Sequence, residues 1–395
     1  MRKKSKVLFG IDVFLEERSY KKFLKQKVAL LCNQASVNKD LVLSYVAFKE
    51  IFGSNFKFIF SPQHGLFAEK QANMVFSEDI IEPITQIRVI SLYGPRLSPE
   101  KEHLYEIDVV FVDLQEVGCR VYTYIWTLFL FMKECNRLNK KIVVLDRPNP
   151  IGGNIEGPLL EKEFFSFVGM DVLPLRHGLT LGEIALLFKK RHFPEIDLEV
   201  IPLKNYSKSM VWRNVERPWI FPSPNLPVWE STLVYPGMVL LEGTNLSEAR
   251  GTTLPFLMFG APYLDLKKCI SLFRDAEIEK KFGVILKPVC FEPMYDKWKG
   301  KLCKGFQIFV KNFNTFKPVI FALTLIKLVR ENFEEFEFLP PPYEFEREKS
   351  PIEILVGNKK VLNWLCGDKF DLEEYLEYNL KKFKEEVKDC LLYDC

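Results

Sequence analysis

The chain has 395 residues, of which 48% are hydrophobic and 27% are charged, so it can bury a sizeable core and is long enough for two domains. Lys and Arg number 55 against 52 Asp and Glu, which gives a net charge of +3. This charge is too small for the electrostatic attraction on which nucleic-acid-binding proteins depend, so nucleic acid is not expected as a partner.

The first residues, MRKKSKVLFGIDVFLEERSYKKFLKQ, are basic, but Asp12 and Glu16 interrupt the apolar run, and we expect no signal peptide. No later apolar stretch reaches the roughly 18 residues that cross a bilayer, so we expect no membrane partner and a cytoplasmic protein. The nine cysteines lack a CxxC spacing and fit neither a disulfide framework nor a zinc site. Cys290 and Cys303 are the pair to check for a disulfide.

Short apolar runs alternate with helical patterns through the first two-thirds of the chain. The predicted strands are continuous and rich in β-branched residues, as in strands buried on both faces. They cover residues 27–32, 57–60, 88–93, 108–114 and 141–146, and another apolar run lies at 198–203. Helical periodicity covers 41–53, 122–140 and 180–192, the last with a capping box of Thr180 and Glu183. This alternation predicts an α/β fold with a doubly wound parallel sheet.

The remaining third has a different composition. From about residue 215 the chain is rich in Pro and Gly, and we expect a long ordered loop region with little helix. Beyond about 262 the sequence predicts strands over 282–291 and 305–310 and helices over 317–333 and 372–388, which indicates a smaller α+β domain. We place the two domains at residues 1–232 and 233–395.

Polar side chains follow four of the predicted strands. Ligands of an open parallel sheet bind beyond the carboxyl ends of its strands, so these residues are site candidates, although each also fits a turn or an ion pair. They are Asn33, Gln34, Ser36, Gln63, His64, Gln115, Glu116, Arg120, Asp146, Arg147 and Asn149. No GxGxxG or P-loop spacing follows a strand, and no cofactor is expected.

Two later stretches add candidates. RHGLTLGE (176–183) places Arg176 and His177 directly before a helix N-terminus, where the exposed N–H groups favour anions. LLEGTNLSEARGTT (240–253) crowds charged and amide side chains into a turn with apolar flanks, which a purely solvated loop would not need. These side chains are Glu242, Asn245, Glu248 and Arg250.

Long motifs in one order resemble the exo-β-N-acetylmuramidase family (NamZ), glycosidases that remove N-acetylmuramic acid from the non-reducing end of peptidoglycan fragments. The motifs are GIDVFLE (10–16), CNQASV (32–37), SPQHGLF (61–67), QEVGCRVYTYIWT (115–127), LDRPNPIGG (145–153), EGPLL (156–160), RHGLTLGE (176–183), PSPNLP (222–227) and VYPGMVLLEGTNLSEARGTT (234–253). The resemblance implies a Rossmann-like N-terminal domain, a smaller C-terminal domain, an active site in the cleft between them, and a muramic acid glycoside as substrate in cell wall recycling.

The resemblance departs from the family at position 63. The family has a glutamate there, in SPEHG, that is taken to be catalytic, whereas this chain has Gln63 followed by His64. Glycoside hydrolysis normally uses one carboxylic acid to protonate the leaving oxygen and a second carboxylate as nucleophile or base. An amide has no proton to give at neutral pH, so Gln63 can orient a group but cannot be the acid. The candidate acids in matched motifs are Glu116, Glu242 and Glu248.

An acidic amino sugar also needs binding groups. The lactyl carboxylate of muramic acid suits a guanidinium, and Tyr122 and Tyr124 could stack on a sugar face or simply begin a buried helix. The candidate substrate-binding residues are Asn33, Arg120, Tyr122, Tyr124, Arg147, Asn149, Arg176, His177, Asn225, Asn245 and Arg250.

Three interpretations of Gln63 stay open. Another carboxylate is the acid, or the 2-acetamido group of the substrate assists while Gln63 holds it, or the protein binds a sugar without cutting it. The rival enzyme class is a metal-dependent hydrolase with His64, His177, Asp113 and Asp146, but no two of these share a spacing such as HxxxH. We expect a glycoside hydrolase that uses neither metal nor cofactor.

Overall fold

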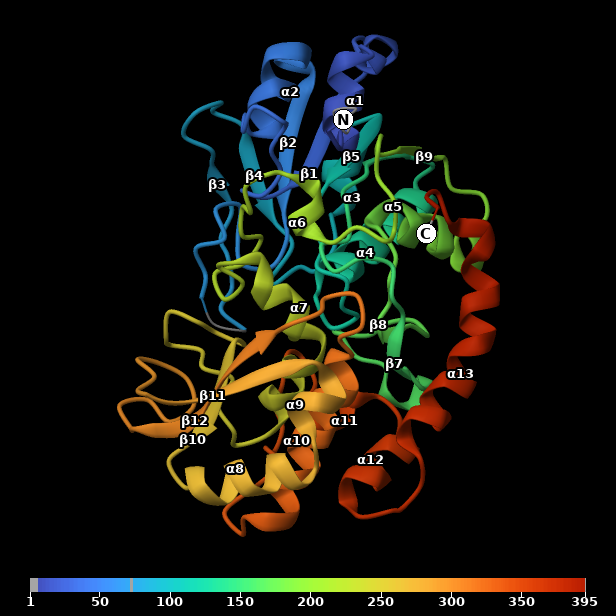
Figure 1. Ribbon diagram of the computed structural model, residues 1–395. Helices are drawn as coiled ribbons and strands as arrows, with labels where there is room; N and C mark the ends of the chain where they lie inside the picture. The colour runs from blue at the N-terminus through green and yellow to red at the C-terminus, as the bar shows by residue number, and fades with distance from the viewer. Residues whose placement is uncertain (1–5, 72–73, 395) are drawn as a thin grey trace, which may run out of the picture.

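The computed structural model describes residues 6–71 and 74–394. It has two lobes, the upper one built on a large sheet and the lower one on a small antiparallel sheet (Figure 1). Within the described residues, none of the helices combines the length and the hydropathy that crossing a membrane requires.

The large sheet has seven strands in the order β3-β4-β2-β1-β5-β6-β9. Its parallel strands are β1 (Val28–Cys32), β2 (Phe56–Ser61), β4 (Arg88–Ser91), β5 (Val109–Asp113), β6 (Lys141–Leu145) and β9 (Leu198–Ile201), and β3 (Ile80–Ile81) pairs antiparallel at the edge. The chain therefore starts near the middle of the sheet and extends it in both directions, as in Rossmann-like folds. The predicted α/β fold class and the five predicted strands are confirmed, and the apolar run at 198–203 also forms a strand.

Helices cover both faces of this sheet because alternate strand residues point to opposite sides. In β1, Leu30 belongs to the apolar core that includes α1 (Gly10–Glu16) and α2 (Ser44–Phe52). Leu31 belongs to the core of the other face, which is covered by α3, α4 and α5. These helices span Lys101–Tyr105, Tyr124–Arg137 and Leu181–His192. The predicted capping box is present, with the Glu183 N–H donating to Thr180 Oγ1 at 3.3 Å and the Thr180 N–H to Glu183 Oε2 at 3.0 Å.

The Pro- and Gly-rich stretch after residue 215 differs from expectation. It contains α7 (Trp229–Met238), which continues into the 3₁₀ turn Val239–Gly243, so the expectation of little helix is wrong there. The physical reason is burial: α7 packs against α10 (Pro318–Asn332), and a Cβ on Gly237 would lie 1.9 Å from the Pro318 carbonyl oxygen. The proposed domain boundary at 232/233 falls within α7.

The lower lobe is the predicted α+β part. Its sheet has the antiparallel order β10-β12-β11. The strands are β10 (Met258–Ala261), β11 (Val284–Phe291) and β12 (Cys303–Val310), and the helices besides α10 are α8 (Leu266–Asp275), α9 (Ile278–Phe282), α11 (Pro351–Val356) and α12 (Lys359–Cys366). Cys290 and Cys303 lie on the paired strands β11 and β12, and both are free thiols.

Several smaller elements connect these parts. The strands β7 (Glu156–Leu159) and β8 (Pro174–Arg176) pair antiparallel, and α6 (Trp212–Val215) is a single turn. Short 3₁₀ turns lie at Ser19–Phe23, Gly53–Asn55, Lys162–Phe164 and Lys388–Cys390.

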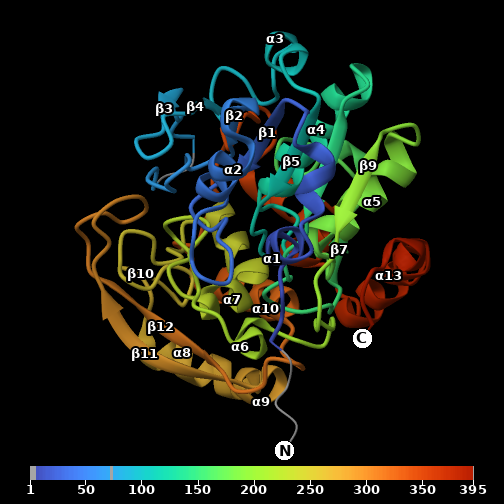
Figure 2. The same cartoon turned by 90° about the horizontal axis from the view of Figure 1, so that it is seen from above.

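The last helix, α13 (Leu372–Val387), runs from the lower lobe along one side of the molecule to the upper lobe (Figures 1 and 2). Its end is tied to α5 by the ion pair between Arg191 Nε and Glu386 Oε1 at 2.8 Å. Beyond it, the Tyr393 hydroxyl donates to Asp146 Oδ2 at 2.6 Å. The C-terminal segment therefore covers the carboxyl end of β6, where an open parallel sheet usually binds its ligand.

Candidate active site

A pocket lies between the two lobes, beyond the carboxyl end of β2, and we call it the β2 pocket. It is lined by Gln63, His64, Val121, Tyr122, Thr123, Val168, Ser223, Asn225, Leu226, Tyr235, Glu242, Arg250, Phe256, Tyr343 and Glu344. The enclosed space is about 30 Å³, room for about two water molecules. With the side chains in this arrangement, the space is smaller than a sugar ring.

Gln63 faces a carboxylate that the sequence analysis did not single out. Its Nε2 donates to Glu344 Oε1 at 3.1 Å, and its Oε1 accepts from the Thr123 hydroxyl at 2.6 Å. The second carboxylate oxygen of Glu344 accepts from the Tyr93 hydroxyl at 2.6 Å. Both ends of the Gln63 amide are therefore engaged by protein groups, and an acidic group lies directly beside the glutamine.

Glu344 is buried, with 3% of its surface exposed. Burial raises the pKa of its carboxyl above the ordinary value, because the charged form loses its water, and the hydrogen bonds from Tyr93 and Gln63 oppose that rise. Glu344 also has φ +48°, in a tight turn in which the Tyr343 and Glu346 backbones exchange two hydrogen bonds of 2.9 Å. A non-glycine residue in this conformation carries strain of about 1–2 kcal/mol.

Glu242 is the second pocket carboxylate, and it has a different environment. Its Oε1 accepts from Arg250 Nη2 at 2.5 Å and its Oε2 from the Tyr343 hydroxyl at 2.5 Å. Burial raises the pKa of Glu242, but the adjacent guanidinium opposes the rise. Arginine stays protonated in proteins, so the Arg250 guanidinium stabilises the charged form of Glu242 as an ion pair.

His64 is buried in the turn after β2. Its Nδ1 lies 2.7 Å from the Lys70 carbonyl oxygen, which can only accept, so the neutral ring carries its proton on Nδ1. Desolvation lowers the pKa of His64 to about 4, and the imidazole is neutral at pH 7. Its backbone φ of +74° adds a second strained residue to the pocket wall.

Tyr122 and Asn225 line the pocket as side chains of its wall. The Tyr122 ring lies 4.6 Å from the Tyr124 ring, centroid to centroid, and Asn225 Oδ1 accepts from the Tyr295 hydroxyl at 2.8 Å. Tyr124 and Asn33 do not line the pocket. Asn33 Nδ2 donates to the Tyr124 hydroxyl at 2.8 Å, so the two support each other beside it.

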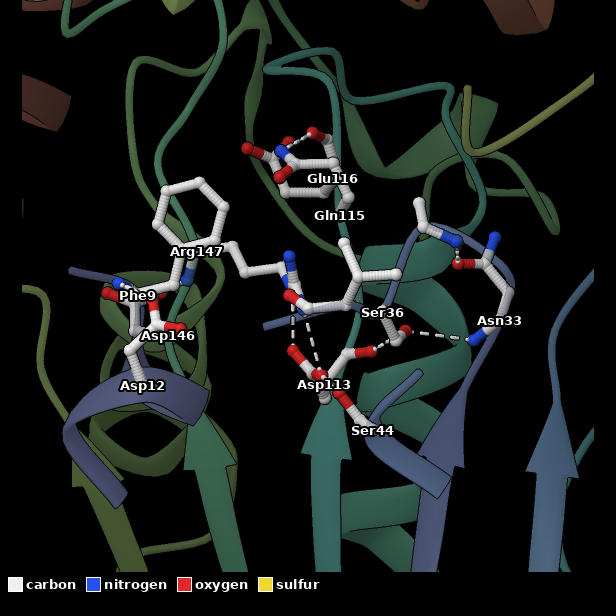
Figure 3. Close-up of polar contacts among 12 residues, drawn as sticks. Phe9, Asp12, Asn33, Ser36, Ser44, Asp113, Gln115, Glu116, Asp146 and Arg147 are labelled. Carbon is white, nitrogen blue, oxygen red and sulfur yellow. Dashed lines mark hydrogen bonds and ion pairs between the residues drawn. The ribbon is translucent and has the colours of Figure 1, made fainter. Parts of the chain in front are cut away.

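Beyond the carboxyl ends of β5 and β6, side chains of the protein itself contact one another (Figure 3). Arg147 Nε lies 2.5 Å from Asp113 Oδ1 and Nη2 lies 2.9 Å from Oδ2, while the Ser44 hydroxyl donates to Asp113 Oδ2 at 2.5 Å. The Ser36 hydroxyl donates to the Asp113 carbonyl. Arg147 and Asp113 are fully buried, so the Arg147 guanidinium forms its ion pair inside the protein.

Arg120 and Arg176 are also buried away from the β2 pocket. The Arg120 guanidinium donates to backbone carbonyls, including those of Leu173 at 3.2 Å and Leu355 at 2.5 Å. Arg176 donates to the carbonyls of Ile151 and Phe316. Of the four arginines considered for the lactyl carboxylate, the structure brings only Arg250 to the pocket.

The other candidates from the sequence lie elsewhere as well. Glu116 Oε2 is 3.3 Å from His177 Nε2 in a buried pair, and Glu248 Oε2 is 2.5 Å from Lys297 Nζ. The side-chain amides of Asn149 and Asn245 donate to the backbone carbonyls of Leu179 and Glu335. None of these residues is in the pocket lining. Across residues 6–71 and 74–394, no three His, Cys, Asp or Glu side chains are grouped in a way that could hold a metal ion.

Sequence reasoning missed Glu344, Tyr343 and Tyr235. Glu344 lies in PPYEFEREKS, outside every motif used above, where Glu346 and Glu348 are equally acidic neighbours. Nothing in that stretch separates the three glutamates except the fold, which buries Glu344 and leaves Glu348 exposed.

Comparisons with known proteins agree along the whole chain. The family models for exo-β-N-acetylmuramidase NamZ match residues 28–230 (N-terminal) and 233–393 (C-terminal). The chain is 40% identical over 340 residues to the peptidoglycan β-N-acetylmuramidase NamZ of Bacillus subtilis, covering 85% of this chain and 81% of that protein.

Two crystal structures of DUF1343 family proteins from Bacteroides fragilis share the fold. One has a TM-score of 0.85 at 27% identity, covering 98% of this chain and 99% of the other. The second has a TM-score of 0.76 at 28% identity, covering 99% of each chain. With both family models matched in order and a relative at 40% identity, this chain belongs to the NamZ family of exo-β-N-acetylmuramidases.

Proposed function

We propose that this chain hydrolyses the terminal β-linked N-acetylmuramic acid of peptidoglycan fragments in the β2 pocket. Family membership supports the substrate class, and the relative from Bacillus subtilis is a peptidoglycan β-N-acetylmuramidase. Hydrolysis is possible although position 63 is a glutamine, because two buried carboxylates, Glu242 and Glu344, line the pocket that contains Gln63. Glycoside hydrolysis normally uses such a pair.

The charges of the pocket also fit an acidic sugar. Arg250 has 7% of its surface exposed, its Nη2 donates to Glu242, and its Nε lies 3.5 Å from Glu248 Oε1, so in this proposal Nη1 is the nitrogen that meets a substrate carboxylate. Tyr122 lines the pocket with its aromatic ring, and Asn225 lines it with an amide that the Gln71 carbonyl and the Tyr295 hydroxyl hold in place. In this proposal Arg250 binds the lactyl carboxylate, and Gln63 keeps its contacts with Thr123 and Glu344.

The experiment that tests the function is incubation of the purified protein with a chromogenic muramic acid β-glycoside, with released chromophore and free N-acetylmuramic acid both measured. We expect release of both in equal amounts, with saturation in substrate. Saturable binding of the glycoside with no sugar released at any pH would instead identify a sugar-binding protein that does not cut.

Replacing Arg250 with lysine is expected to lower kcat/KM for a muramic acid glycoside about 10- to 100-fold. The ammonium keeps the charge next to Glu242 but loses the planar fork that grips a carboxylate, and charge-assisted hydrogen bonds contribute about 1.5–3 kcal/mol each. The control is the matching N-acetylglucosamine glycoside, which has no lactyl group. Equal losses on the two glycosides would show that Arg250 does not read the lactyl carboxylate.

A further inference from the structure

We infer that Glu344, contributed by the lower lobe, is the catalytic acid of this chain and that Gln63 is its positioning residue. The inference rests on the proposed function. Gln63 Nε2 donates to Glu344 Oε1 at 3.1 Å, so the acid lies within one hydrogen bond of the position where the family has its glutamate. The chain therefore keeps a carboxylic acid in the same corner of the pocket, although it comes from a residue 281 positions away in sequence.

The surroundings of the two pocket carboxylates separate their roles. Glu242 is paired with Arg250 at 2.5 Å, and this contact stabilises its charged form. The hydrogen-bond partners of Glu344 are neutral, a phenol and an amide, and no ion pair among the described residues includes it. A buried carboxyl whose hydrogen-bond donors are neutral holds its proton more readily than one in an ion pair. Two carboxyl groups in such different environments suit an acid and an ionised partner.

The backbone supports the same assignment. Glu344 has φ +48° in the turn closed by Tyr343 and Glu346, a position where glycine is free of strain and glutamate is not. The turn itself does not need a carboxyl group, because the hydrogen bonds that close it are made by backbone atoms. Strain of this kind persists where the surroundings fix it and is common at functional sites.

The groups that face Glu344 set its titration. Tyr93 comes from the end of β4, Gln63 from the turn after β2, and Arg250 is the charged group that acts on it. Tyr343 and Tyr235 also lie close enough to interact with it. Tyr93, Gln63 and Arg250 each favour the carboxylate form of Glu344, whereas burial favours the protonated form. Removing any one of these three contacts therefore raises the pKa of Glu344, and activity is then lost at a higher pH.

The step balances without a further reactant. The Glu344 proton passes to the glycosidic oxygen while the bond from that oxygen to the anomeric carbon breaks, and the bonding electrons leave with the oxygen. Water supplies the hydroxyl that bonds to the anomeric carbon. Glu242 accepts the proton that water loses, and this proton then passes through solvent to Glu344, which restores the acid.

The test compares Glu344→Gln with Glu348→Gln, an exposed glutamate of the same segment. We expect Glu344→Gln to lower kcat about 10²- to 10⁴-fold on a disaccharide, whose sugar leaving group needs protonation, and much less on a 4-nitrophenyl glycoside, whose leaving group does not. The kcat of Glu348→Gln should match that of the wild type on both substrates. Both variants should have the melting temperature of the wild type. Equal losses on both substrates, or full activity on both, would overturn the assignment.

If Glu344→Gln does not fold, two other variants test the role of Glu344. Gln63→Glu places another carboxyl group beside Glu344, so the pair retains a proton to higher pH, and the alkaline limb of the pH profile should move up. Tyr93→Phe removes a donor to the carboxylate and should move the limb in the same direction. If the alkaline limb of the pH profile stays at its wild-type position in both variants, Glu344 is not the catalytic acid. A wild-type protein that releases no sugar would contradict the proposed function itself.

Discussion

Replacing Glu242 with glutamine is expected to lower kcat on a muramic acid β-glycoside about 10²- to 10⁴-fold, because an amide cannot act as base or nucleophile. In the proposed site, Glu242 is the ionised partner of the acid, held by Arg250 and by the Tyr343 hydroxyl. Glutamine keeps the shape and one acceptor oxygen, so Arg250 retains a partner. The measurement is kcat and KM for the purified variant beside the wild type.

Two comparisons make the Glu242 result specific. Glu230→Gln changes an exposed glutamate in the first turn of α7 and should leave kcat unchanged. Added azide, an external nucleophile, should restore part of the activity of Glu242→Gln if the carboxylate acts at the anomeric carbon. Wild-type kcat in Glu242→Gln would remove Glu242 from the mechanism.

Replacing Asp113 with alanine is expected to lower the free energy of unfolding by about 3–5 kcal/mol. The change leaves the Arg147 guanidinium buried without its carboxylate, and it also removes the acceptor of the Ser44 hydroxyl (Figure 3). Unfolding in urea, followed by circular dichroism, measures the loss. Asp40→Ala, at an exposed site, should change stability by less than about 0.5 kcal/mol.

A double variant separates the buried charge from the lost contacts. When Asp113→Leu is combined with Arg147→Met, neither charge is left alone, and we expect the double variant to be more stable than Asp113→Leu by itself. A double variant as unstable as Asp113→Leu would show that the pair stabilises the protein through its hydrogen bonds to Ser44 and Val37 rather than by neutralising a buried charge.

The large sheet could be predicted because its strands are apolar on both faces. Val28–Cys32 and Val109–Asp113 are buried at every position, and continuous apolar runs of that length are typical of parallel strands. Helix α7 could not be predicted in the same way. It contains Pro236 and Gly237, which disfavour helix locally, and its contact with α10 stabilises a conformation that its own composition does not.

The site was predictable only in part, for a related reason. Gln63, Glu242 and Arg250 lie in motifs whose residue types indicate chemistry, and the structure brings all three to one pocket. Arg147 follows a strand in the same way as Gln63, yet it meets Asp113 instead of solvent. Glu344 reaches the pocket from the far end of the chain. Distances of this kind depend on how the two lobes pack, which local sequence patterns do not encode.

The most direct test of the proposed mechanism is a crystal structure of the Glu344→Gln variant with an uncleaved muramic acid β-glycoside bound. We expect the sugar in the β2 pocket, with its glycosidic oxygen about 2.6–3.2 Å from the side chain at position 344 and its lactyl carboxylate on Arg250. A sugar bound at the carboxyl ends of β5 and β6, or with its glycosidic oxygen facing away from position 344, would contradict it.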